Sequence, residues 1–219
     1  MIKKSIISLV VSLLILPAVY IPALAAPSSQ LDGGETSHLI FMREEEKLAR
    51  DVYITLGALY PDVATFSNIV SSEENHTASM RDKLAQYNIP DPSTDDTVGV
   101  FTGAEYGWYF LEKFTELVDW GKTNLLEALY VGAFIEELDL NDIVNCPDVI
   151  VDTDNGIDLG ECGLLYTDNK SLIRSYNNLL DGSKSHLRAY VRNIESIIGA
   201  GNYEAQYLTQ EEVDEILGR

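Results

Sequence analysis

The chain of 219 residues is poor in positive charge, with 15 Lys and Arg against 35 Asp and Glu and a net charge of −20. A protein that binds the phosphates of nucleic acids needs a basic face, so this scarcity argues against a nucleic-acid partner. Hydrophobic residues make up 46% of the chain and charged residues 23%. Because that share of apolar side chains can form a core, the chain is not an acidic disordered protein. We expect one folded domain.

Long hydrophobic runs are absent after the first 26 residues. At the start, two lysines precede an apolar run over residues 6–16, and an Ala-Leu-Ala cleavage site follows at 23–25. This order is typical of a secretory signal peptide. An uncleaved anchor is the alternative, but Pro17 and Pro22 interrupt the run. We predict a signal peptide over residues 1–25, a secreted or extracytoplasmic protein in the periplasm or at the cell surface, and no membrane attachment after cleavage.

Cysteine is scarce as well, since Cys146 and Cys162 are the two in the chain. An even number in an exported protein favours one disulfide, with two free thiols as the alternative. Between them Asp152, Asp154 and Asp158 alternate with other residues in the manner of a calcium loop. The glycine falls one place early for an EF-hand. A solvated acidic loop is therefore the favoured interpretation, and calcium binding is the weaker alternative.

What the chain has in abundance is helical periodicity. After a polar leader over residues 26–37, apolar residues recur three and four positions apart in four long segments. These segments cover about residues 38–60, 62–87, 123–144 and 169–198, with a shorter amphipathic helix at 105–120 and a terminal helix opened by Thr209 and Glu212. No segment is typical of a strand. We predict one all-α domain over residues 38–219, an antiparallel four-helix bundle with an additional crossover helix and a short C-terminal helix.

Each of the four apolar stripes is interrupted near its middle by acidic or histidine side chains. They are Glu46 in the first long helix, Glu73 and His76 in the second, Glu136 and Asp139 in the third, and His186 in the fourth. Burying a carboxylate without a partner costs several kcal/mol, so a bundle core with four of them needs neutralisation. Two divalent cations would balance four carboxylates. A hydrogen-bonded or salt-bridged core without metal is the alternative.

The spacing of these residues supports one shared site. Glu46 and His76 lie 15 residues before and after Pro61, so both sit about 22 Å from the turn at about 1.5 Å per residue. Glu136 and His186 lie at unequal distances from the long loop between their helices. We therefore expect the fourth long helix to extend beyond the third.

Two further pairs of residues lie outside this set of proposed ligands. Glu35 and His38 have the same spacing as Glu73 and His76, but they stand beside two glycines at the predicted start of the first helix. We interpret them as leader and first-turn residues. Tyr53 and Tyr190 fall a helical turn or two from the proposed ligands. They are candidates for tuning or reducing a metal centre, and ordinary core tyrosines are the alternative.

The residues around these positions resemble a known superfamily. Glu46-Lys47-Leu48-Ala49-Arg50-Asp51-Val52-Tyr53 resembles the first-helix pattern of rubrerythrin-type ferritin-like proteins, and Glu73-Glu74-Asn75-His76 resembles their second-helix Glu-x-x-His. Residues 44–53, 131–139 and 182–190 more closely resemble a poorly characterised ferritin-like family of microbial proteins of unknown function. The resemblance covers about residues 38–217.

This resemblance implies a ferritin-like fold with a di-iron or di-manganese carboxylate centre that reacts with dioxygen or peroxide. By position it implicates Glu46, Glu73, His76, Glu136 and His186 as ligands, with Asp139 in the place of a second acid. Ser183 departs from the pattern, because the fourth helix of the superfamily usually has Glu there. A mononuclear or weak second site is then the alternative. Two cysteines also exclude a rubredoxin module, which needs four.

We therefore predict an exported ferritin-like protein that binds two iron ions and oxidises Fe(II) with dioxygen or peroxide. Carboxylate and imidazole ligands suit iron or manganese and do not exclude zinc. The predicted partners are metal ions and these oxidants, and association into a homo-oligomer is left open. The alternatives are a metal-binding or iron-buffering protein without turnover and a metal-free bundle with a structural or interaction role.

Overall fold

The structure, a computed structural model, describes residues 30–153 and 155–219. Within these residues the fold is all-helical, with seven helices and no strand: α1 (Gly33–Leu59), α2 (Ala64–Gln86), α3 (Gly107–Gly121), α4 (Leu125–Val144), α5 (Asp148–Asp152), α6 (Lys170–Ile198) and α7 (Gln210–Leu217). The all-α prediction is confirmed. The predicted signal peptide lies outside the described residues, so its prediction is untested. Every helix in the described ranges is too short or too polar to cross a membrane.

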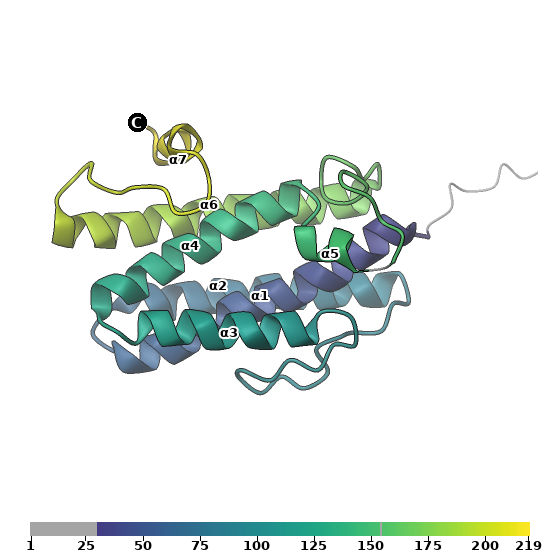
Figure 1. The fold of residues 1–219 in the computed structure, drawn as a ribbon, viewed down its shortest axis with the longest axis horizontal. Helices are drawn as coiled ribbons and strands as arrows, with labels where there is room; N and C mark the ends of the chain where they lie inside the picture. Colours follow the sequence, from purple (N-terminus) through teal and green to yellow (C-terminus); the bar gives the residue numbers. More distant parts are fainter. Residues whose placement is uncertain (1–29, 154) are drawn as a thin grey trace, which may run out of the picture.

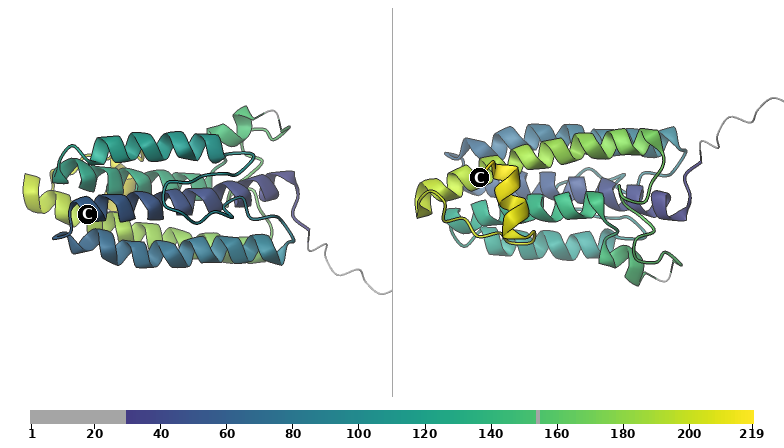
Figure 2. Two further views of the ribbon diagram at one scale, coloured as in Figure 1. Left: turned by 90° about the horizontal axis from the view of Figure 1, so that it is seen from below. Right: turned by 90° about the horizontal axis from the view of Figure 1, so that it is seen from above.

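The four long helices lie side by side along the longest axis of the molecule (Figure 1). α1 packs mainly against α2, and α4 packs mainly against α6, while α1 also contacts α4 and α2 contacts α6. α3 covers α1 and α4 from outside (Figure 2). The first residues of α6 extend beyond the end of α4, as predicted (Figure 1). The interior faces of α1, α2, α4 and α6 therefore enclose one core.

α1 begins at Gly33, five residues before the predicted start, so the leader predicted to reach residue 37 is too long. The reason is a capping box. The Asp32 carboxylate accepts a hydrogen bond from Glu35 N at 2.9 Å, and the Glu35 carboxylate accepts one from Asp32 N at 3.2 Å. These bonds satisfy amide groups that the first turn of a helix leaves without partners.

The segment between α2 and α3 is anchored to α1 by a buried ionic network. Asp51 is fully buried and accepts hydrogen bonds from Lys47 Nζ at 2.5 Å and from Gly99 N at 2.9 Å. Lys47 Nζ also donates to the Thr97 carbonyl at 3.0 Å. These bonds hold a long connection, without helix of its own, against the side of the helical core.

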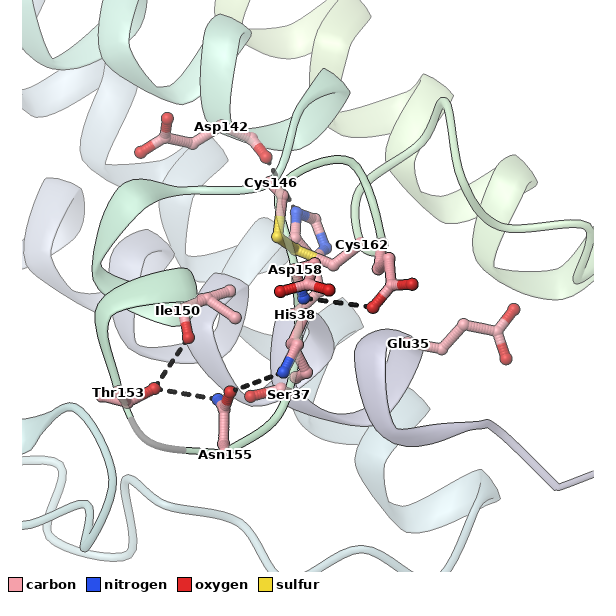
Figure 3. Close-up of a disulfide and its surroundings, with 12 residues drawn as sticks. Glu35, Ser37, His38, Asp142, Cys146, Ile150, Thr153, Asn155, Asp158 and Cys162 are labelled. Atoms are coloured by element: carbon pink, nitrogen blue, oxygen red, sulfur yellow. Dashed lines mark hydrogen bonds between the residues drawn. A yellow bond between two sulfur atoms is a disulfide. The ribbon is translucent and has the colours of Figure 1, made fainter.

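The loop between α4 and α6 is closed by a disulfide between Cys146 and Cys162, which confirms the pairing expected from the sequence (Figure 3). The loop also contains the short helix α5, which the periodicity did not predict because one turn is too short to show a period. The end of the loop folds back on α4, where Leu164 N donates to the Ile143 carbonyl at 2.9 Å.

The C-terminal segment is fastened by one buried carboxylate on α4. Glu137 accepts hydrogen bonds from the Tyr203 hydroxyl at 2.6 Å and from the backbone N–H groups of residues 206–208 at 2.6 to 2.9 Å. The predicted capping box of Thr209 and Glu212 is confirmed at the start of α7. α7 then packs against α6, crossing its direction (Figure 2).

Candidate metal centre

Glu73 on α2 lies between the two histidines that the sequence singled out. Its Oε2 is 3.1 Å from His76 Nδ1, and its Oε1 is 2.7 Å from His186 Nδ1. The imidazole rings themselves lie 5.5 Å apart, centroid to centroid. The His76 and His186 side chains, from helices far apart in the sequence, thus converge on the two oxygens of a single carboxylate.

One further glutamate stands beside each histidine. Glu46 Oε2 lies 3.2 Å from His76 Nδ1, and Glu136 Oε2 lies 3.4 Å from His186 Nδ1. The result is two groups of side chains that could each hold a metal ion, Glu46 with Glu73 and His76, and Glu73 with Glu136 and His186. Within each group the ligand atoms lie within 4.8 Å of one another. Five of the six predicted ligands therefore come together, and Glu73 belongs to both groups.

Asp139, the sixth predicted ligand, belongs to neither group. Its carboxylate accepts a hydrogen bond from the Ser183 hydroxyl, and both side chains are buried. The second Asp139 oxygen has no hydrogen-bond partner among the described residues. Asp139 thus reaches across from α4 to Ser183 on α6, the position that departs from the pattern the sequence resembles.

A glycine makes room for His76. A Cβ atom built on Gly182 of α6 would lie 2.5 Å from both Cε1 and Nε2 of the His76 ring. The imidazole therefore occupies space that any other residue at position 182 would take. Its side chain remains 12% exposed and that of His186 remains 8% exposed, so the site touches solvent through the two imidazoles.

Both candidate tyrosines pack beside the second group. The Tyr53 hydroxyl donates to Glu136 Oε1 at 2.6 Å. The Tyr190 ring lies 5.3 Å from the Tyr53 ring, and its buried hydroxyl has no hydrogen-bond partner among the described residues. Tyr53 therefore orients one of the carboxylates of the site, whereas Tyr190 contributes its ring to the wall behind it.

The electrostatics of the site favour positive charge. Burial alone would lower the pKa of both histidines, but the neighbouring carboxylates raise the pKa of His76 and His186 well above the ordinary value. Burial raises the pKa of Glu46, Glu136 and Asp139. The two imidazoles hold the pKa of Glu73 below its usual range despite its burial. Protons therefore neutralise the carboxylates here, and a bound cation would compete with them.

Glu35 and His38 form no such site. Glu35, predicted as a leader residue, caps α1 in its first turn, and His38, predicted in the first turn, lies in the second and is fully buried. Its Nδ1 is 2.9 Å from the Tyr176 hydroxyl, and its Nε2 is 2.8 Å from the Asp142 carbonyl oxygen. Burial lowers the His38 pKa to about 4. Since both ring nitrogens already have partners, His38 is a core residue.

Of the three aspartates in the loop between α4 and α6, Asp152 and Asp158 belong to neither group of described residues that could hold a metal ion. Asp154 lies outside the described residues, so the weaker prediction of calcium binding is untested. Asp158 lies beside the disulfide, and its backbone N–H donates to Glu161 Oε2 at 3.1 Å (Figure 3).

The sequence pattern missed two acidic residues next to the site. Glu45 and Asp142 are both 4% exposed, and their carboxyl groups face each other between α1 and α4. Burial raises the pKa of each, to about 6 in Asp142. Asp142 lies one helical spacing after Asp139, so the same periodicity could have indicated it. Glu45 stands directly beside Glu46 in the sequence, and adjacent residues on a helix do not share a face, so periodicity did not indicate it.

Comparisons with known proteins agree with this fold. Residues 35–219 match the model of a family described as an uncharacterized protein domain, DUF2202. Uncharacterized protein MJ0754 of Methanocaldococcus jannaschii is 38% identical over 191 residues, which are 87% of this chain and 90% of the relative. A crystal structure of hypothetical protein MJ0754 from Methanococcus jannaschii matches with a TM-score of 0.73 and 36% identity, over 89% of this chain and 98% of that chain. The chain therefore belongs to the family of the uncharacterized protein domain DUF2202.

Proposed function

We propose that this protein is an exported, ferritin-like metalloprotein that holds two iron ions between α1, α2, α4 and α6 and oxidises Fe(II) with dioxygen or peroxide. Manganese is the alternative resident metal. In this proposal the four long helices form an antiparallel four-helix bundle, with α3 as the crossover helix. The observation that carries the proposal is the position of Glu73, whose two oxygens each face a different histidine at 3.1 and 2.7 Å.

The donor set fits a pair of such ions. Carboxylate oxygens and imidazole nitrogens are ligands that iron and manganese accept. One Glu46 oxygen and one Asp139 oxygen are buried without hydrogen-bond partners among the described residues. Buried polar atoms are costly in that state, and a cation would satisfy them. Glu46 and His76 would hold one ion, Glu136 and His186 the other, and Glu73 both.

When bound, the two ions supply the redox chemistry toward the oxidant that side chains alone lack. The surrounding residues keep the ligands in place. Tyr53 orients Glu136 by donating a hydrogen bond, and Ser183 orients Asp139 in the same way. Such contacts behind the ligands typically tune metal affinity. The slight exposure of the two imidazoles leaves the α2–α6 face as the approach for a small oxidant.

One prediction and one structural feature support export. The predicted signal peptide would direct the chain out of the cytoplasm. The disulfide between Cys146 and Cys162 is a bond that persists mainly in oxidising compartments. Location of the mature chain in a fractionated host culture, together with its N-terminal sequence, tests this part of the proposal.

Metal titration tests the site itself. We expect metal-free mature protein to bind two Fe(II) per chain under anaerobic conditions and to consume dioxygen or peroxide on exposure. Glu73→Gln should abolish binding of both ions, because Glu73 belongs to both groups. Glu74→Gln is the matched control, since its side chain is exposed on the same helix and its loss removes the same charge.

The outcomes separate the alternatives. Two bound ions without oxidation faster than that of free Fe(II) would identify a buffering or carrier protein. A wild type that binds no ion, or a Glu73→Gln variant that binds as well as the Glu74→Gln control, would contradict the metal site and favour a structural role.

A further inference from the structure

A second feature of the molecule lies on the other side of α1, away from the two histidines. A cavity of about 640 Å³ lies among α1, α3 and α4 and is bordered by residues around α5. Its size falls in the range of small-molecule sites. Much of its wall is aromatic, contributed by Trp108, Tyr109, Phe110, Trp120, Phe134 and Tyr207.

Two buried carboxyl groups lie in the lining of this cavity. They are Glu45 and Asp142, which face each other and are each 4% exposed. Asp142 accepts a hydrogen bond from Asn141 Nδ2 at 2.8 Å, but Glu45 Oε2 is buried without any partner among the described residues. A buried oxygen in this condition lacks a donor, and none of the described aromatic side chains of the wall donates a hydrogen bond to it.

The charged groups around the cavity do not supply the missing donor. Among the described residues, Lys113 is the one basic residue that lines it. Its ammonium group forms an ion pair with Glu116 at 2.8 Å and lies 5.7 Å from the centre of the Tyr109 ring. Asp148 and Asp152 add further negative charge. The cavity therefore combines an acidic lining with aromatic walls, which disfavours anionic ligands.

The residues of the lining also argue against a bare metal ion as the ligand of this cavity. Glu45 and Asp142 belong to neither of the side-chain groups in the described residues that could hold one. Asp148 and Asp152 belong to neither group either, and aromatic walls offer no ligands. By contrast, an organic ammonium ion brings several N–H donors for the carboxyl oxygens and an apolar body for the walls, and aromatic rings attract cations.

We propose that this cavity binds a primary ammonium ion with an aromatic or branched apolar body. The ammonium group donates hydrogen bonds to Glu45 and Asp142, and the apolar body packs between Trp108 on α3 and Phe134 on α4. The proposal does not depend on the metal site, because none of the residues of the two metal-binding groups lines this cavity.

The chain offers a built-in reporter for this binding. Its two tryptophans, Trp108 and Trp120, both line the cavity, so the whole tryptophan fluorescence comes from the site. The probe is phenethylamine, titrated into metal-free mature protein, with phenethyl alcohol as the neutral isostere and phenylacetate as the anion. We expect a saturable fluorescence change with the amine, about tenfold weaker binding of the alcohol, and no binding of phenylacetate, because charge-assisted hydrogen bonds are the stronger ones.

Variants of the two carboxyl groups test whether they bind the ammonium group of the probe. Glu45→Gln and Asp142→Asn should each weaken phenethylamine binding about tenfold by removing a charge-assisted bond. Glu112→Gln should leave it unchanged, since Glu112 is exposed on α3 and does not line the cavity. If Glu45→Gln does not fold, Asp142→Asn and the comparison of amine with alcohol on the wild type still decide the question.

Four results would overturn the proposal. Phenethylamine and phenethyl alcohol could bind with equal affinity, or phenethylamine could bind unchanged to a folded Glu45→Gln or Asp142→Asn variant. Calcium chloride alone could give the same saturable fluorescence change, or the tryptophan spectrum could change on dilution of the protein without any probe. The last result would mean that a second copy of the chain covers the cavity.

Discussion

At the scale of single residues, the space left by Gly182 controls where the His76 ring can lie. A methyl group on this α6 position would meet the imidazole at 2.5 Å, closer than a Cβ atom can approach. The ring is the far end of a side chain that can rotate, so it would move while the helix stays in place. The glycine thus serves the candidate site at the expense of helix propensity.

Gly182→Ala should therefore separate stability from metal binding. Alanine is favoured over glycine inside a helix by about 1 kcal/mol, so the metal-free variant should melt at the same temperature as the wild type or higher. Because His76 is displaced, the variant should no longer bind the ion held by Glu46, Glu73 and His76. Anaerobic Fe(II) titration and thermal denaturation measure the two effects. Wild-type stoichiometry and affinity in the variant would show that His76 does not need its present position.

The contact between Ser183 and Asp139 gives the second prediction. Because Asp139 already reaches the Ser183 position, Ser183→Glu should crowd a second buried carboxylate against it. We expect the metal-free variant to lose about 3 kcal/mol of unfolding free energy or more, as for an unpaired buried charge. Denaturant unfolding measures this loss, with Ser183→Ala as the milder control that removes one hydrogen bond, worth about 1 kcal/mol.

Metal content shows which role Asp139 has. Asp139→Ala should lose metal as severely as Glu73→Ala if Asp139 takes the place of the missing glutamate. A Ser183→Glu variant that is more stable than the wild type, binds two ions and oxidises iron faster would show instead that the wild type leaves a ligand position open.

At the scale of helices and segments, Glu137 joins α4 to the C-terminal part of the chain. One carboxylate accepts four hydrogen bonds, three of them from consecutive backbone N–H groups. No regular secondary structure satisfies those groups in residues 203–208. The course of this segment, including Tyr207 at the aromatic cavity, therefore depends on a single buried side chain.

Glu137→Ala should release this segment while leaving the long helices folded. Leaving the Tyr203 hydroxyl and three amide groups without their acceptor should cost roughly 3 kcal/mol. Limited proteolysis should then cut after α6 much faster than in the wild type, and Fe(II) stoichiometry should stay the same. Equal cleavage rates in the two proteins would contradict the anchoring role of Glu137.

At the scale of the whole molecule, the buried acids and histidines make the unfolding free energy depend on pH. Bound metal should reverse this dependence. Burial raises the pKa of Glu46 to about 7 from 4.5, and the carboxylates raise that of His76 and His186. Groups with a raised pKa stabilise the fold below their unfolded value and lose this contribution as the pH rises through the folded value. Glu73, with its lowered pKa, acts in the opposite direction, but only below about pH 4.5.

Metal-free protein should therefore become less stable between about pH 4.5 and 7. A further loss should follow above pH 6.5, because the histidines lose their protons in the unfolded chain while they keep them in the folded protein. Metal binding releases the same protons, so its affinity should increase over this range. We expect the gain in melting temperature on loading to be larger at neutral than at mildly acidic pH. His38 does not affect this difference, since it lies outside the site. Unchanged melting temperatures on chelation at both pH values would favour a metal-free structural role.

The helices were predictable because their signals are local. Periodic apolar residues located the long helices to within a few residues, and the exception, the start of α1, arose because the Asp32 and Glu35 cap was interpreted as part of a leader. The same periodicity indicated which acids and histidines face inward. With two cysteines in the chain, the disulfide partners followed as well.

The tertiary structure decided how these side chains meet. Periodicity gives the face of a helix but not its depth or rotation against its neighbours, so it could not show that Glu73 faces both histidines or that Ser183 contacts Asp139. Nor could it show that Glu46 turns to His76 while the adjacent Glu45 lines an aromatic cavity under α3. By itself, the sequence determined the helices and the inward-facing polar residues, because both depend on neighbours along the chain. The shared carboxylate and the cavity depend on contacts between helices distant in sequence, which only packing specifies.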